Sequence, residues 1–155
     1  MSLSITLPKE YGYVLLTATA TFFVSTWHGM RVAPFRKAAK MPYPNAYATT
    51  SDIDKADSEE RKKAMYLFNC AQRAHANFME NYNSTLPAIL IAGLKFPLTS
   101  AAVGAVWTVC RVLYARGYTR ADKEQGKGRY AGMAFWLCQA VLYGMTGWMG
   151  VQMFM

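Results

Sequence analysis

The stretch Asn69–Ser84, NCAQRAHANFMENYNS, places polar side chains inside an otherwise apolar run. Five of them step by four, four, three and four residues: Asn69, Arg73, Asn77, Glu80 and Ser84. At helical spacing these side chains share one face of a single helix. Apolar residues border the stretch at 64–68 and 86–94, and their combined length is sufficient to cross a bilayer. The stretch therefore predicts a membrane-spanning helix with an arginine and a glutamate at membrane depth.

Ionisable side chains are costly at membrane depth, where they usually face a bundle interior or a water-filled cavity. The polar face of this helix is therefore the first candidate for a functional site. A structural alternative stays open, in which Arg73 and Glu80 only hold neighbouring helices together.

The charges of the chain are segregated along the sequence. It has 155 residues, a formal net charge of +8 and a mean hydropathy of +0.03. Of its nine acidic residues, only Glu80 lies inside a candidate span. The basic excess borders hydrophobic segments, where it indicates membrane topology and affinity for anionic lipid head groups rather than nucleic-acid binding.

Long apolar segments dominate the chain. Those of membrane-spanning length lie at about 11–30, 64–94, 98–118 and 130–155. They predict an all-α integral membrane protein, with residues 1–155 forming one domain built as a four-helix transmembrane bundle. The N-terminus lacks the pattern of a cleaved signal peptide, so we expect the first span to be retained as an anchor.

The connections between the spans differ in charge and composition. The segment 31–63 is polar and contains Pro34, Pro42 and Pro44, so we expect a solvated loop there. This segment and 119–129 are basic, whereas the connection between the second and third spans contains one lysine, Lys95. The positive-inside rule then places both basic loops in the cytoplasm and both termini on the other side. Within the second span, Pro87 predicts a kink.

Several kinds of chemistry are disfavoured by the sequence. The three cysteines are far apart in apolar segments and are expected to be packed thiols. His28 and His75 lie on different spans without thiolate or carboxylate neighbours in sequence, so we expect no metal site. Glu80 has no acidic companion, no serine lies in a GxSxG motif and no glycine-rich phosphate loop is present.

Polar residues of several spans point to the cytoplasmic half of the bundle. They are Arg36, Lys37, Lys40, Arg73, Asn77, Glu80, Tyr114, Tyr118 and Arg129. Guanidinium groups bind carboxylates in a planar fork, a glutamate pairs with an ammonium, and tyrosine hydroxyls donate hydrogen bonds. This set suits a small peptide with two carboxylates and one α-amine.

Two motifs also carry a family resemblance. The runs Phe68–Asn83 (FNCAQRAHANFMENYN) and Arg111–Tyr118 (RVLYARGY) resemble the membrane-associated proteins of eicosanoid and glutathione metabolism, the MAPEG family. The resemblance extends over essentially the whole chain. It implies a homotrimer of four-helix subunits in the endoplasmic reticulum membrane, with the active site facing the cytoplasm. Glutathione would bind between neighbouring subunits as a co-substrate.

The activity implied by the resemblance is glutathione transfer to a lipophilic electrophile, with leukotriene-synthesising and lipid-hydroperoxide-reducing relatives. By motif, the glutathione-binding positions are Arg36, Arg73, His75, Asn77, Glu80, Tyr114 and Tyr118, of which Arg36 and His75 act across the subunit interface. Arg129 matches the arginine that stabilises the thiolate, chosen over Arg120 and Lys127 because it directly precedes the apolar run. Lys37 matches a basic position over the lipid substrate.

Two other functions remain as alternatives. A non-enzymatic scaffold of the same fold would bind lipid and present it to another enzyme, but such relatives lack the full glutathione set. A channel would need polar faces on all four helices, and the uncharged fourth span argues against it.

The topology is tested by membrane-impermeant maleimide labelling of single cysteines in sealed vesicles, cytoplasmic face outward. We expect Lys55→Cys to react at once and Lys95→Cys to react only after permeabilisation, because the charge bias puts the two positions on opposite sides. The parent chain is the control for its native thiols. Equal labelling of both variants in sealed vesicles would contradict the topology.

Overall fold

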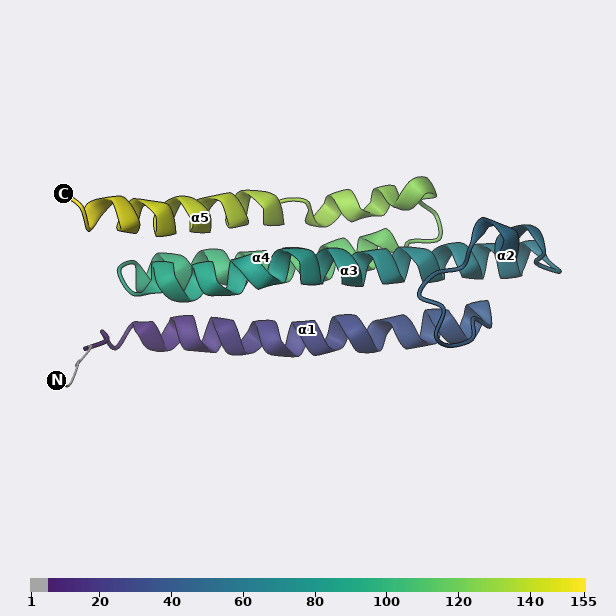
Figure 1. Ribbon diagram of the computed structural model, residues 1–155, viewed down its shortest axis with the longest axis horizontal. Coiled ribbons are helices and arrows are strands. Elements are labelled where there is room, and N and C mark those ends of the chain that lie inside the picture. Colours follow the sequence, from purple (N-terminus) through teal and green to yellow (C-terminus); the bar gives the residue numbers. More distant parts are fainter. Residues whose placement is uncertain (1–5) are drawn as a thin grey trace.

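The computed structural model describes residues 6–155. These residues form helices and no β-strand: α1 (Tyr11–Ala39), α2 (Thr50–Asp54), α3 (Glu59–Gly93), α4 (Pro97–Tyr118), the 3-10 helix η1 (Glu124–Gly132) and α5 (Phe135–Gln152). The long helices run along the same axis (Figure 1). The predicted all-α class is therefore confirmed.

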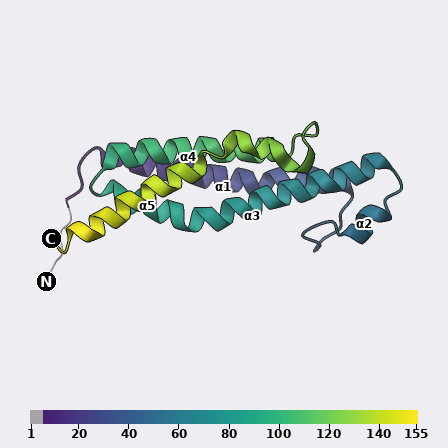
Figure 2. The ribbon, with the colours of Figure 1, turned by 90° about the horizontal axis from the view of Figure 1, so that it is seen from above.

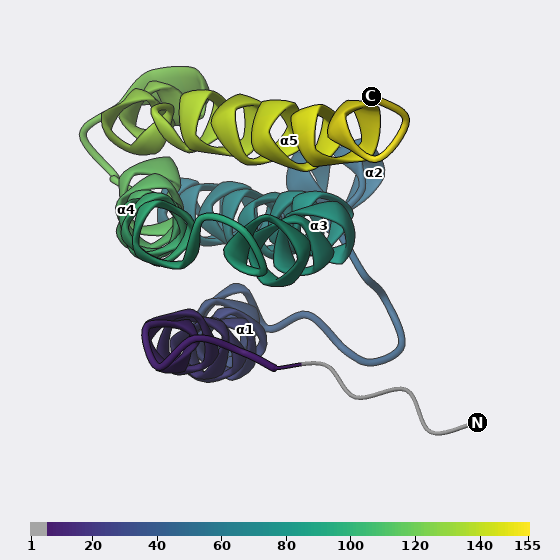
Figure 3. The ribbon, with the colours of Figure 1, turned by 90° about the vertical axis from the view of Figure 1, so that its left-hand side faces the viewer.

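The long helices are arranged in layers. Seen along the bundle, α3 and α4 lie side by side between α1 and α5 (Figure 3). Helix α5 crosses the α3 and α4 layer obliquely (Figure 2). Successive long helices run in opposite directions along the bundle (Figure 1). One end of the bundle therefore contains the end of α1, the start of α3, the end of α4 and η1.

Hydropathy alone supports fewer membrane spans than the sequence predicted. Within residues 6–155, α4 is the one helix that is both long and apolar enough to cross a membrane by length and composition. Threonines, tyrosines and glycines dilute the apolar residues of α1 and α5, and the polar face of α3 does the same there. Hydropathy therefore does not confirm four spans, and the four-span bundle stays a prediction.

The polar segment after the first predicted span is more helical than expected. Helix α1 continues through Pro34 to Ala39, and α2 and the first turns of α3 occupy further parts of 31–63. Proline removes one backbone donor but does not end α1, whose last turn contains Arg36 and Lys37, and cations there favour the helix dipole. Pro87 likewise lies inside α3. The prediction of a continuous solvated loop was wrong for these helical parts.

The predicted fourth span also begins differently. Residues up to Gly132 form η1, and the regular helix α5 begins only at Phe135. The backbone of η1 lies directly against α4: a Cβ at Gly128 would be 2.2 Å from the Gly117 carbonyl oxygen, and one at Gly132 would be 2.3 Å from that of Cys110. Side chains larger than hydrogen do not fit there, so these glycines fix the position of η1 on α4.

Buried aromatic residues fill the middle of the bundle. Phe78 of α3, Trp107 of α4 and Phe135 of α5 are each 0% exposed and belong to one cluster. Polar side chains also connect the helices: the hydroxyl groups of Ser84 in α3 and Tyr143 in α5 are hydrogen-bonded. Within α5, Gln139 Nε2 donates to the same Tyr143 Oη at 2.6 Å. A hydrogen bond between membrane helices contributes about 0.6 kcal/mol. The bond between Ser84 and Tyr143 therefore helps to hold α5 against α3.

We expect Gly132→Ala to destabilise the protein by about 1–3 kcal/mol, the usual range for overpacking, because the added methyl group meets the α4 backbone. The measurement is the melting temperature of the detergent-purified protein. Gly144→Ala is the matched control, since a Cβ at Gly144 meets nothing within 4 Å. Equal melting temperatures for the two variants would show that η1 is not held by this contact.

Candidate functional site

The centre of the site is an ion pair on the polar face of α3. Arg73 Nη1 donates to Glu80 Oε1 at 2.6 Å and Nη2 donates to Oε2 at 3.2 Å. The two residues are seven apart, two helical turns, a distance that the long arginine side chain spans. Asn77 lies between them, and its Nδ2 donates to Glu80 Oε2 at 3.4 Å. The structure thus brings together three of the five residues that the sequence assigned to one face of this helix.

This ion pair is accessible. The side chain of Arg73 is 47% exposed and that of Glu80 is 53% exposed in the single chain. Exposed ion pairs contribute only about 0–1 kcal/mol to stability, so the pair is poorly explained as a device that holds the fold together. The exposed Arg73 guanidinium can bind a carboxylate of a ligand, and the exposed Glu80 carboxylate can bind an ammonium group of the same ligand.

Helix α4 supplies the aromatic side of the site. The Tyr114 and Tyr118 rings pack edge to face with centroids 5.5 Å apart. One turn before Tyr114, Arg111 is fully buried and its Nη1 donates to Asn77 Oδ1 at 3.0 Å. The steps of three and four residues put Arg111, Tyr114 and Tyr118 on one face of α4. Arg111 was nevertheless not among the site residues predicted from the sequence. The signal for it was a charge in an otherwise apolar span.

Arg129 reaches the same end of the bundle from η1. Its guanidinium carbon lies 5.3 Å from the Tyr118 ring centroid and 4.8 Å from that of Tyr130. Its Nη1 donates to the Gln125 carbonyl at 2.8 Å. Gln125 and Gly126 have φ values of 52° and 61°, and this left-handed turn directs the chain back toward α4. The close approach of Gly128 to α4 fixes the backbone beside Arg129.

The other basic residues of this loop point elsewhere. Arg120 is exposed and bonds to Asp122 in a fork, at 3.0 Å and 2.6 Å. The Arg120 guanidinium lowers the pKa of the Asp122 carboxyl below its ordinary value through this hydrogen bond. Lys127 is exposed. The geometry therefore supports the choice of Arg129 over both as the arginine beside the tyrosines.

A pocket of about 310 Å³ lies against this group of residues. The residues that line it come from α3, α4, η1 and the segment before α2: Tyr47, Tyr66, Asn69, Cys70, Arg73, Tyr118 and Gln125. The Tyr66 hydroxyl accepts a hydrogen bond from the Gly126 amide at 2.7 Å, which joins α3 to η1 at the pocket. The arrangement offers a cation and aromatic hydroxyl groups to a small polar ligand.

Three of the predicted residues do not join this group within one chain. Arg36 donates to the Pro42 carbonyl at 3.2 Å and packs over the rings of Tyr43 and Phe68. His75 stacks with His28, at a centroid distance of 6.5 Å. Lys37 is exposed at the end of α1. The motif expects Arg36 and His75 to act on a neighbouring subunit, and that expectation stays a prediction.

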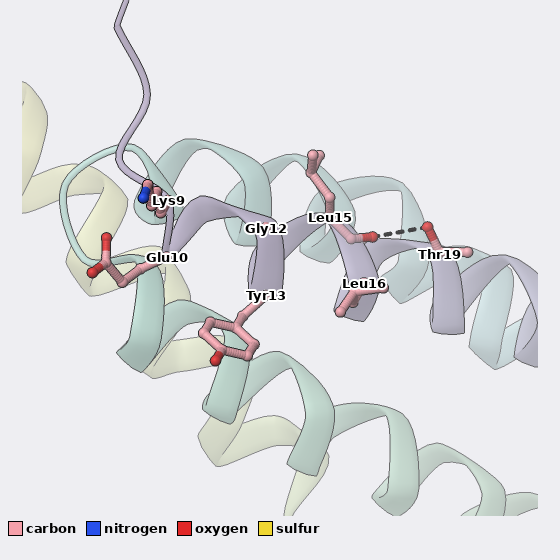
Figure 4. Close-up of a pocket in the computed structure, with 7 residues that line it drawn as sticks. All are labelled: Lys9, Glu10, Gly12, Tyr13, Leu15, Leu16 and Thr19. Atoms are coloured by element: carbon pink, nitrogen blue, oxygen red, sulfur yellow. Dashed lines mark hydrogen bonds between the residues drawn. The ribbon is translucent and has the colours of Figure 1, made fainter.

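A larger pocket of about 640 Å³ lies at the opposite end of α1 (Figure 4). Its lining comes from the first turns of α1 and the residues just before it: Lys9, Glu10, Gly12, Tyr13, Leu15, Leu16 and Thr19. Thr19 is occupied by a hydrogen bond to the Leu15 carbonyl at 2.8 Å. Tyr13, Leu15 and Leu16 contribute exposed apolar side chains, and Lys9 and Glu10 contribute charges. None of the residues that the sequence assigned to a site lines this pocket. We therefore place the candidate site at the Arg73 end of the bundle.

A model of the MAPEG family matches residues 14–148, and the chain belongs to this family. The family is membrane-associated, and it includes glutathione transferases and related glutathione-dependent enzymes. The match covers every long helix at least in part, and it covers all the residues of the candidate site. Within the residues that the structure describes, no group of three or more histidine, cysteine, aspartate or glutamate side chains is arranged to hold a metal.

We expect Glu80→Gln to weaken glutathione binding about tenfold, since an ionic hydrogen bond of about 1.5–3 kcal/mol is replaced by a neutral one. The melting temperature should change little, because the pair is half exposed. Isothermal titration and thermal unfolding of the purified protein measure the two effects. Glu59→Gln, which removes an exposed pair with Lys62 on the same helix, is the control. Unchanged affinity in Glu80→Gln would remove Glu80 from the site.

Proposed function

We propose that this chain is a membrane-bound glutathione transferase, and within its family most similar to microsomal glutathione transferase three. It would activate the glutathione thiol as a thiolate for conjugation to lipophilic electrophiles, for reduction of lipid hydroperoxides, or for both. The observation that supports this most is a continuous set of contacts. Asn77, beside the Arg73 and Glu80 pair, bonds to Arg111, which packs on Tyr114. Tyr114 then packs on Tyr118, and Tyr118 on Arg129.

The charges of glutathione match the accessible groups of the site. The tripeptide has two carboxylates and one ammonium group. Arg73 offers a planar fork for a carboxylate, Glu80 offers an acceptor for the ammonium, and Asn77 adds an amide. Because Arg73 and Glu80 pair with each other, ligand binding would exchange this pair for two pairs of the same kind with the ligand.

Arg129 would stabilise the reactive sulfur. A free thiol has a pKa of about 8.5, so only a few per cent is thiolate at neutral pH. A fixed guanidinium in a low-dielectric pocket favours the anion, and each unit of lowering corresponds to about 1.4 kcal/mol. Arg129 lies over the Tyr118 ring and forms no ion pair among residues 6–155, so its charge is available for this purpose.

Two reactions follow from such a thiolate. In conjugation, sulfur attacks an electrophilic carbon, a C–S bond forms, and the leaving group or opened epoxide oxygen takes the displaced electron pair and a proton. In reduction, two glutathione molecules cleave the O–O bond of one hydroperoxide and yield an alcohol, water and glutathione disulfide. The protein supplies orientation and charge and needs no covalent intermediate of its own.

The membrane setting completes the proposal. The protein would be a multi-pass homotrimer of the endoplasmic reticulum with its site facing the cytoplasm. Arg36 and His75 of a neighbouring subunit would contact glutathione, and Lys37 would lie near the lipid substrate. The half-exposed state of the Arg73 and Glu80 pair in the single chain supports a site completed by a neighbour.

The test is Arg129→Leu. We expect it to keep much of the glutathione affinity supplied by α3 but to lower kcat about 100-fold, as for loss of one group that stabilises a developing anion. The ultraviolet thiolate band of bound glutathione, followed across pH, should titrate below free glutathione in the parent and move upward in the variant.

Arg120→Leu is the matched control, because Arg120 belongs to the same loop but is paired with Asp122. It should leave both kcat and the thiolate titration unchanged. An unchanged titration in Arg129→Leu, or a change confined to Arg120→Leu, would refute the role given to Arg129.

A further inference from the structure

Arg111 is a buried cation without a carboxylate partner. It is 0% exposed, and no acidic oxygen lies within 4 Å of it among residues 6–155. Its guanidinium carbon is instead surrounded by aromatic rings, the nearest being Phe135 at 4.1 Å and Tyr114 at 4.8 Å. Cation–π contacts compensate part of the lost hydration.

The hydrogen bonding of Arg111 is incomplete. Its Nε and Nη2 have no partner within the described part of the chain, and Nη1 bonds only to Asn77. Buried donors without partners cost free energy, about 1–3 kcal/mol each. A leucine or methionine of similar volume would avoid this cost in an apolar span. Packing therefore does not explain an arginine at this position, and the Asn77 contact is the feature that distinguishes it.

The contact determines the orientation of the Asn77 amide. A guanidinium only donates hydrogen bonds, so the Asn77 atom that faces Arg111 must be the carbonyl oxygen. On the other side, the Glu80 carboxylate only accepts, so the atom facing it must be the amide nitrogen. Both neighbours demand the same orientation, and the observed distances of 3.0 Å and 3.4 Å agree with it.

We propose that Arg111 is a positioning residue for the glutathione site: it holds the Asn77 carbonyl so that the amide N–H groups are presented to Glu80 and to the ligand beside it. The inference rests on the proposed function. Arg111 itself is buried behind Asn77 and would not touch glutathione. Hydrogen bonds connect buried Arg111 to Asn77, Asn77 to Glu80, and Glu80 to exposed Arg73. A buried charge on α4 would therefore orient the Asn77 amide on α3.

The test is a double-mutant cycle on glutathione affinity with Asn77→Ala and Arg111→Lys, measured by isothermal titration of the purified protein. Lysine keeps the charge but cannot reproduce the guanidinium geometry. We expect each single variant to bind glutathione several-fold more weakly. In the Asn77→Ala background, Arg111→Lys should have no further effect on affinity. Arg116→Lys, at an exposed position of the same helix, is the control.

The outcomes separate the two hypotheses. If the parent chain does not bind glutathione, the proposed function fails. If the parent binds and the two effects multiply, Arg111 acts independently of Asn77 and the positioning role is refuted. A merely structural role would lower the melting temperature in both backgrounds and would leave affinity changes independent of Asn77.

A second variant keeps the inference testable if Arg111→Lys does not fold. Asn77→Asp retains an oxygen for Arg111 and gives the buried cation a charged partner, but it removes the donor toward Glu80 and the ligand. Its melting temperature is measured in the Glu80→Gln background, so that no second carboxylate faces residue 77. We expect it there to equal or exceed that of Glu80→Gln alone, while glutathione affinity in the otherwise unchanged chain falls at least tenfold. A melting temperature as low as that of Asn77→Ala in the same background would show that residue 77 does not bond Arg111, and retained affinity would show that its N–H groups are not used.

Discussion

An arginine and a glutamate inside a long helix of a membrane-associated protein need partners, and the candidate site depends on how they find them. Arg73 and Glu80 satisfy each other across two turns of α3, with Asn77 between them. The pair remains half exposed, so it is not sealed into the fold. Helix α4 contacts this face through Arg111, which is buried and donates a hydrogen bond to Asn77. Tyr114 of the same helix packs against the Arg111 guanidinium. The polar face of α3 and the neighbouring residues of α4 together form the candidate site.

A second constraint is the contact between the backbones of α4 and η1. Gly117, Gly128 and Gly132 permit an approach that no larger residue would allow. This approach brings Arg129 back over Tyr118 after the chain has left the bundle. A guanidinium in a flexible loop would lose much of its effect on a thiolate, because charge stabilisation depends on a fixed distance. The glycines therefore connect a packing feature to the proposed chemistry.

The sequence predicted the parts that depend on periodicity. The shared face of Arg73, Asn77 and Glu80 follows from spacing alone, and the all-α class follows from the apolar segments. The sequence did not predict the continuation of α1 through Pro34, because one proline removes a single hydrogen bond while the rest of the helix persists. It also missed η1, whose position depends on contacts between Gly132 and α4 that have no local signal. Arg111 was visible as a charge in an apolar span, but its bond to Asn77 joins residues 34 apart in the chain.

We propose that the α3 face and its neighbours bind glutathione through its charges. The test is isothermal titration of the detergent-purified parent chain with glutathione and with its analogue lacking the α-amine. We expect saturable glutathione binding and much weaker binding of the deaminated analogue, because Glu80 would lose its ammonium partner. Absence of saturable glutathione binding, or equal affinity for both ligands, would contradict it.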